Sequence, residues 1–157
     1  ASNHTVENYI NAFLESFLIY KAERFDVKGK NLLVRDYKYY SVDTGLRSYL
    51  LGKKANSDMG HILENIVYLE LRRRHYDVFI GKFKTKEIDF VATKDGKKVY
   101  VQVCRNLPED SNREIQNLKD IDDNYPKYIV TLDKYDVGNI DGIEIIYLEY
   151  FLLKQEY

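Results

Sequence analysis

The chain has 157 residues, 45% of them hydrophobic, with 24 Lys and Arg against 25 Asp and Glu and a formal net charge of −1. This length suits one large domain, or one domain with a small appendage. The near-neutral charge argues against a strong non-specific nucleic-acid binder, whose domain is usually basic. The single cysteine excludes an internal disulfide and favours a reducing cytoplasm. No apolar run predicts a membrane-spanning helix or a signal peptide, so no membrane partner is expected.

The first 52 residues are predicted to form a helix, a two-stranded ribbon and a short second helix. Apolar residues recur at helical spacing from Val6 to Phe17. Strands are predicted over 17–25 and 32–42, and a helix over 43–51. A helix followed by a ribbon is typical of the second half of a winged helix, which predicts a partial winged-helix element. The alternative, which we favour for this stretch alone, is a simple packing helix.

The stretch from 58 to 104 is predicted to form a long helix over 58–75 and strands over 77–82, 87–93 and 98–104. An Asp95-Gly96 turn between the last two strands is a strong hairpin signal. Two polar residues, Asp89 and Gln102, interrupt this otherwise apolar hairpin and are expected side by side. An unpaired buried carboxylate is costly, so Asp89 requires a partner, a metal or a water-filled notch.

The remaining chain is predicted to contain a helix over 111–123, strands over 128–132 and 143–148, and a short helix over 149–153. Residues 133–142 are predicted to form polar turns. The helical crossover predicts that the strand over 128–132 is parallel to the strand over 98–104. The polar connector after Gly52 is the best internal boundary and divides the chain into 1–52 and 53–157.

The central block resembles the core of the restriction-endonuclease-like nucleases, in which a helical Glu precedes an Asp on the second strand and Glu-x-Lys on the third. The matching positions are Glu64, Asp89, Gln102 and Cys104. The resemblance implies an α/β fold with a mixed sheet flanked by helices. It also implies a Mg²⁺ site with Asp89 and Glu64 as ligands, with Glu64 facing Asp89 from the helix. Gln102 offers only a neutral oxygen and Cys104 no ammonium, so the implied site is degenerate.

Neighbouring charged residues leave alternatives open. Helical periodicity does not separate Glu64 from Glu70, and the resemblance alone selects Glu64. In the alternative interpretation, Glu64 is a solvated residue at the rim of the apolar face. Glu70 would then form a salt bridge with an Arg from elsewhere in the chain. A Lys that had migrated to the central helix could replace the missing cation, but that helix carries Arg and no Lys. The run 72–74 is expected to complement the helix dipole.

A closer resemblance is to the C-terminal part of prokaryotic AAA+-type ATPases that carry a C-terminal domain of uncharacterised function. Its longest runs are Asp43-Thr44-Gly45-Leu46-Arg47, Glu87-Ile88-Asp89-Phe90-Val91 and Asp123-Asn124-Tyr125-Pro126-Lys127. The resemblance implies an N-terminal ATPase domain as partner. This sequence has no Gly-x-x-x-x-Gly-Lys-Ser/Thr, so ATP is expected only in that other domain.

Two further features carry predictions about chemistry. Lysines occupy every second position at Lys82, Lys84 and Lys86. In an extended loop they would lie on one side, where they could contact phosphates near Asp89. The alternative is that they form a solvated sheet edge that blocks pairing with another strand. Cys104 is expected as a buried, reduced thiol. A nucleophilic role would need a nearby histidine.

Three functions follow as hypotheses. The first is a non-catalytic nuclease-fold domain that serves as a targeting or assembly module of an ATPase. The second is a Mg²⁺-dependent nuclease acting on DNA, and the third is a DNA-binding module that acts through the winged-helix part, with DNA or a protein as partner. The residues at 102 and 104 favour the first over the second, and the near-neutral charge weighs against the third.

Overall fold

The computed structural model describes residues 2–52, 58–107 and 113–157. At the N-terminus, helix α1 (Asn3–Glu15) leads into an antiparallel ribbon of β1 (Ile19–Asp26) and β2 (Asn31–Ser41). Helix α2 (Thr44–Leu51) follows, and the Asp43 side chain caps it by accepting bonds from the amides of Gly45 and Leu46. These bounds agree with the prediction to within a few residues.

The central block begins with helix α3 (Met59–Arg73), followed by β3 (Asp77–Phe83), β4 (Lys86–Lys94) and β5 (Lys97–Cys104). The three strands form consecutive antiparallel pairs, which confirms the predicted hairpin of β4 and β5. Asp58 occupies the N-cap of α3 but its side chain makes no capping bond there, and it pairs with Arg47 of α2 instead. An ion pair therefore connects the start of α3 to the N-terminal part.

After β5 the described chain contains α4 (Arg113–Lys119), β6 (Lys127–Thr131), a 3-10 turn η2 (Lys134–Asp136), β7 (Gly138–Ile140), β8 (Ile143–Tyr147) and α5 (Leu148–Leu153). The predicted start of α4 at 111 lies outside the described residues. Its predicted end at 123 is wrong, because aspartates favour helices poorly and the Tyr100 hydroxyl donates to Asp123 at 2.6 Å.

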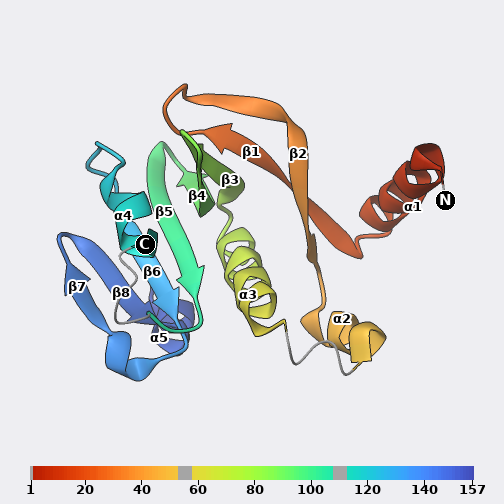
Figure 1. The fold of residues 1–157 in the computed structure, drawn as a ribbon. Helices are drawn as coiled ribbons and strands as arrows, with labels where there is room; N and C mark the ends of the chain where they lie inside the picture. Colours follow the sequence, from red (N-terminus) through yellow and green to blue (C-terminus); the bar gives the residue numbers. More distant parts are fainter. Residues whose placement is uncertain (1, 53–57, 108–112) are drawn as a thin grey trace.

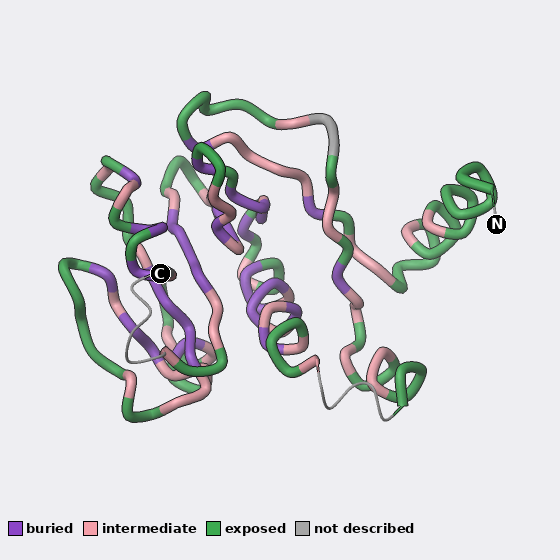
Figure 2. The backbone as a smooth tube through the Cα atoms, in the orientation of Figure 1, coloured by how far each residue is buried: buried purple, intermediate pink, exposed green. Residues whose placement is uncertain are grey.

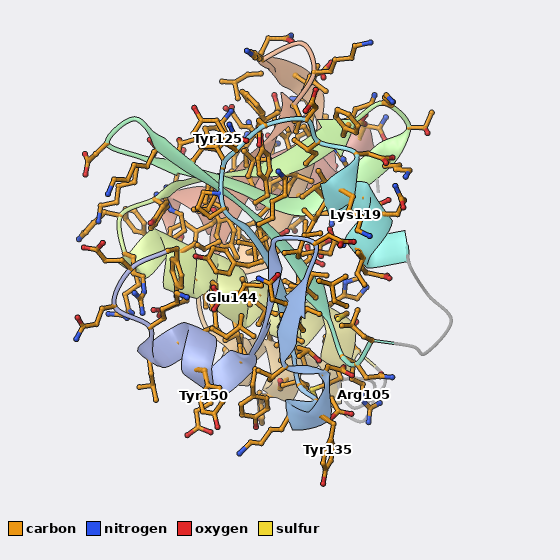
Figure 3. The ribbon with its side chains drawn as sticks, turned by 90° about the vertical axis from the view of Figure 1, so that its left-hand side faces the viewer. Arg105, Lys119, Tyr125, Tyr135, Glu144 and Tyr150 are labelled. Carbon is orange, nitrogen blue, oxygen red and sulfur yellow. The ribbon has the colours of Figure 1, made fainter. Side chains whose placement is uncertain are left out.

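One strand was missed within the polar segment 133–142. This strand, β7 (Gly138–Ile140), pairs with β8, and its three residues are exposed. A run of three residues is too short to show the apolar alternation that predicts a strand. The neighbouring 3-10 turn exposes Tyr135 almost completely, at 98%, and Figure 3 shows this side chain projecting from the body of the protein. The same figure shows Lys119 at the end of α4, where it pairs with Asp141.

The described strands form one eight-stranded mixed sheet in the order β2-β1-β3-β4-β5-β6-β8-β7 (Figure 1). Strand β6 is parallel to β5, which confirms the crossover prediction. The N-terminal ribbon joins this sheet because β1 pairs in parallel with β3 from Arg24 to Asp26. The sheet therefore continues across the boundary expected near residue 52, and the winged-helix interpretation of the ribbon stays a prediction.

The core lies on both faces of the sheet. Helices α3 and α5 cover one face, where Val67, Leu71 and Phe151 pack against strand residues such as Phe90 and Val101. Helix α4 covers the other face through its two apolar residues Ile115 and Leu118. The α/β class with a mixed sheet flanked by helices is thus confirmed. Figure 2 shows the buried positions concentrated in these central strands and in α3. In the described part of the chain, no helix is long and apolar enough to cross a membrane.

Candidate functional site

Asp89 lies in a bulge of strand β4. Phe79 is opposite Val91 and Gly81 is opposite Ile88, so Ile80 alone faces both Asp89 and Phe90. An extra residue of this kind bends a strand and redirects its side chains. Gly81 allows the close approach, because a Cβ at this position would lie 2.9 Å from side-chain atoms of Ile88 and Val91.

The β4–β5 ladder opens next to this bulge, and two side chains cross the opening. The last paired residues on that side are Phe90 and Val101. Beyond them the Asp89 amide donates to Gln102 Oε1 at 3.3 Å, and the Val103 amide donates to Asp89 Oδ2 at 2.8 Å. Asp89 and Gln102 are therefore side by side, as expected, and each replaces a backbone partner where the strands separate.

Glu64 of α3 faces the same opening. Its carboxylate accepts a 2.6 Å bond from the Tyr40 hydroxyl and a 3.1 Å bond from Lys38 Nζ, both on Oε1. Its side chain is only 13% exposed, so Glu64 is not the solvated rim residue of the alternative interpretation. Glu64, Asp89, Gln102 and His61 line one small hollow of about 370 Å³.

Lys38 connects Glu64 to a second carboxylate. Its ammonium lies 2.7 Å from Glu87, which also binds Arg24 at 2.6 Å. Burial opposes the charged forms here, but hydrogen bonds and opposite charges outweigh it. They raise the pKa of Lys38 through Glu87 and Glu64, and lower the pKa of Glu87 through Lys38 and Arg24. We call Arg24, Glu87, Lys38, Glu64 and Tyr40 the clasp, since they tie the ribbon to β4 and α3.

Asp89, which lies beside the clasp, differs in protonation from Glu87 within it. Burial, followed by the nearby charge of Glu64, raises the pKa of Asp89 to about 7. Burial and Glu64 also raise the pKa of Tyr40, which keeps its hydroxyl protonated and able to donate. At neutral pH Asp89 is therefore close to half protonated, whereas Glu87 is ionised.

Comparison with known proteins assigns the chain to a family. A family model described as a domain of unknown function, DUF4143, matches residues 59–151, and another, DUF8612, also of unknown function, matches residues 1–57. The chain belongs to the DUF4143 family. The first match contains α3, the bulge and the opened ladder, so Glu64, Asp89 and Gln102 all lie in the DUF4143 region.

Two curated relatives extend this result. An uncharacterised protein of Haemophilus influenzae is 45% identical over 153 residues, which are 98% of this chain and 38% of the relative. An uncharacterised protein of Methanocaldococcus jannaschii is 35% identical over 120 residues, which are 73% of this chain and 26% of the relative. The chain thus spans well under half the length of both relatives. No solved structure matches it.

The oxygen atoms at the opening of the β4–β5 ladder fit Mg²⁺ poorly. Mg²⁺ requires hard oxygen ligands in near-octahedral geometry. Glu64 Oε1 already accepts from Lys38 and Tyr40, and Gln102 Oε1 accepts from the Asp89 amide. In the described ranges no group of three or more His, Cys, Asp or Glu side chains is placed to hold a metal ion.

Cys104 lies two residues beyond Gln102 on β5 and packs against the apolar cluster under α4. We expected Cys104 to be buried, but it is only half-buried. The β4–β5 ladder that would cover it ends before this residue. Burial, then the acidic neighbours Glu114 and Asp136, raises the pKa of its thiol to about 12. A thiol that stays protonated at neutral pH is a poor nucleophile.

The lysines between β3 and β4 do not form the expected extended loop. Residues 84–85 make a tight turn in which Lys84 has a left-handed backbone, with φ of 57°. Lys86 is bound to Asp120 at 2.9 Å, and Lys82 is exposed on β3. The turn breaks the alternation that predicted one basic side, although a role for the three lysines in binding nucleic acid stays a prediction.

Glu70 and the arginines over 72–74 form a network of ion pairs and hydrogen bonds that the sequence did not reveal. Glu70 is only 8% exposed and binds Arg73 of its own helix and Arg74 at the C-cap, rather than an Arg from elsewhere. Arg74 also donates to the carbonyls of Leu152 and Gln155, beyond what a helix-dipole role requires. This network fastens the C-terminal segment to the end of α3.

Lys38 and Tyr40 are the site residues that sequence reasoning missed. We considered a migrated lysine, such as one on the central helix, which carries none; the lysine that meets Glu64 comes from β2. The available signal is weak: Lys38 and Tyr40 are two residues apart on a predicted strand, so they share a face. Their meeting with Glu64 depends on the pairing of β1 with β3, which no local pattern specifies.

Proposed function

We propose that this chain is a non-catalytic targeting or assembly domain with a restriction-endonuclease-like fold, working within a longer AAA+-type ATPase. The observation that carries the proposal is the clasp. The carboxylate at the helical nuclease position is held by Lys38 and Tyr40, so an oxygen that would bind metal instead fixes the ribbon to helix α3.

The neighbouring positions support the same function. Asp89 accepts the Val103 amide, and its raised pKa lowers its charge at neutral pH. Gln102 adds no charge, so the site has less attraction for a divalent cation than a set of ionised carboxylates would have. Cys104 keeps its proton at neutral pH and carries no positive charge, so it does not replace a lysine ammonium beside the attacking water.

The setting within a larger protein also belongs to this proposal. Both curated relatives continue well beyond the matched region, which leaves room for the ATPase domain that the sequence runs imply. In this proposal ATP is bound by that domain, the protein works in the reducing cytoplasm, and the present chain supplies contacts to DNA or to a protein. An ATPase assay and co-purification with the full-length protein test the partnership.

The deciding experiment is a cleavage assay on pure protein. Supercoiled DNA, single-stranded DNA and RNA are incubated with Mg²⁺ or Mn²⁺, and in parallel with a chelator. We expect no metal-dependent cleavage. Cleavage that disappears in Asp89→Ala would contradict the proposal and establish a metal-dependent nuclease. The double variant Gln102→Glu with Cys104→Lys restores the nuclease pattern. Any gain of cleavage would show that the fold is intact as a nuclease scaffold and that only the residues at these two positions prevent cleavage.

One observation favours the nuclease as a second candidate. Lys38 brings an ammonium to Glu64, and its charge also acts on Asp89. A cation at this place could stabilise the charge that develops on phosphate during hydrolysis. If the assay shows cleavage, Lys38→Met should abolish it, whereas Lys28→Met, an exposed lysine in the ribbon turn, should leave it unchanged.

A further inference from the structure

The two N-terminal helices carry large apolar side chains that are exposed to water in the described structure. Neither α1 nor α2 contains a buried residue. The exposed apolar side chains of the two helices are Val6, Tyr9, Phe13, Leu46, Tyr49 and Leu50. We call these six, together with Phe17 after α1, the N-terminal face. Its four aromatic side chains are between 45% and 83% exposed, so they alone present on the order of 500 Å² to water. This area is comparable with the largest apolar patch of a typical monomer, which is often functional.

Both helices attach to the same end of the ribbon. The chain leaves α1 through Phe17 and Leu18, and the Val42 amide donates to the Leu18 carbonyl at 3.0 Å just before α2 begins. Figure 1 shows both helices on the side of the ribbon away from α4 and α5. Phe17 has a left-handed backbone, with φ of 55°, which is rare for an aromatic residue, and its ring is 76% exposed. The N-terminal face is therefore at one end of the protein, outside the core.

This end is nevertheless tied to the rest of the fold. Arg47 of α2 pairs with Asp58 at the N-cap of α3. The clasp connects the ribbon to α3 through Glu64 and to β4 through Glu87. A partner bound to the N-terminal face would therefore be held in a defined position relative to α3 and the sheet.

The length of the relatives selects what covers the face. The face lies within the DUF8612 match over residues 1–57, whereas the opened ladder lies in the DUF4143 match. The Haemophilus influenzae relative aligns with 98% of this chain, yet the aligned residues are only 38% of that relative. More than half of such a protein is thus joined covalently to the face. A tethered segment has an effective concentration of about a millimolar, which favours it over a second copy of the chain.

We propose that the N-terminal face docks onto an apolar surface in the remaining part of the longer protein, and that the DUF8612 region thereby positions the DUF4143 region within it. The exposed carboxylates Glu7 and Glu15 lie on the same helix as the apolar stripe of α1. An apolar centre with polar residues around it is typical of interfaces between proteins. The proposal rests on the proposed function, because it names the surface that attaches the targeting or assembly domain to the ATPase.

Site-specific thiol labelling tests the proposal in the full-length protein that contains this chain. Tyr9→Cys and Tyr49→Cys each place a thiol on the N-terminal face. Tyr135→Cys is the matched control, because this tyrosine is 98% exposed and precedes β7, at the opposite edge of the sheet from β2. Each labelling rate with a maleimide, read by peptide mass spectrometry, is divided by the rate of the same variant in the isolated chain. We expect at least tenfold slower labelling in the full-length protein at the two sites on the face, and an unchanged rate at the control site.

The outcomes separate this proposal from the previous one. Unchanged rates at all three sites would mean that the face stays in water in the longer protein. Slow labelling of Tyr9→Cys in the isolated chain that is relieved by dilution would mean that a second copy covers it. Either result overturns the proposal. If Tyr9→Cys disturbs folding, as judged by circular dichroism, Tyr49→Cys decides. Metal-dependent cleavage would contradict the non-catalytic function, whereas unchanged labelling without cleavage would contradict only the docking.

Discussion

Helices α1 and α3 have similar lengths and both carry an apolar stripe, yet they are buried very differently. Helix α3 has six buried residues, and α1 has none. On α1 the stripe of Val6, Tyr9 and Phe13 is between 45% and 63% exposed. Periodicity specifies which face of a helix is apolar, but only a partner surface buries it. In the described structure α3 has the sheet as that surface, and α1 does not.

Truncation of apolar side chains should reveal the difference between the two helices most clearly. Leu71 of α3 is fully buried, so Leu71→Ala should lower the free energy of unfolding by about 2–5 kcal/mol. Phe13→Ala on α1 removes a larger side chain but should cost only about 0.5 kcal/mol, because half of that side chain is already in water. Urea denaturation followed by circular dichroism measures both. Equal losses would mean that α1 is buried in solution.

The charged end of α3 should show the next largest effect. Burial opposes ionisation of Glu70, but bonds from Arg73 and Arg74 outweigh it and lower its pKa. A lowered carboxylate pKa stabilises the fold above the unfolded value and loses that contribution as the pH falls. Glu70→Gln should therefore cost roughly 1–3 kcal/mol at pH 7 and less at pH 3. The control Glu7→Gln, on α1, should have little effect at either pH.

Asp89 should show the opposite dependence on pH. Its folded pKa of about 7 is raised above its unfolded value, so its contribution is present at low pH and is lost as the pH rises through 7. Asp89→Asn should flatten the dependence of stability on pH between pH 5 and pH 8. Its gain in stability relative to the wild-type protein should be largest near pH 8. Thermal melts across this range measure the effect. A variant that loses stability most at pH 8 would mean that Asp89 is ionised and well paired.

The clasp should have the smallest effect on overall stability, because Lys38 and Glu87 are partly exposed and water screens partly exposed pairs. Lys38→Met should cost about 1 kcal/mol or less. It should also raise the pKa of Asp89, which loses a nearby positive charge. Side-chain carboxyl NMR titration follows that pKa directly. Lys28→Met is the matched control, and an equal shift in both variants would exclude a specific role for the clasp.

The sequence predicted local elements well and their assembly only in part. The three central strands, their hairpin turn and the parallel crossover to β6 follow from apolar runs, Asp-Gly and a helical connection. The proximity of Asp89 and Gln102 follows from the hairpin register. Lys38 and Tyr40 could not be placed, since their position depends on the long-range pairing of β1 with β3. Strand β7 was missed because all its residues are exposed.

We propose that the positions matching a nuclease site are engaged in hydrogen bonds within the fold and do not hold a metal. Paramagnetic broadening by Mn²⁺ in amide NMR spectra tests it most directly, because the amides of Asp89 and Val103 donate within the opening itself. We expect sub-stoichiometric Mn²⁺ to broaden these two signals no more than those of exposed acidic turns such as Asp95. Selective, saturable broadening of Asp89 and Val103 that is lost in Asp89→Asn would contradict it.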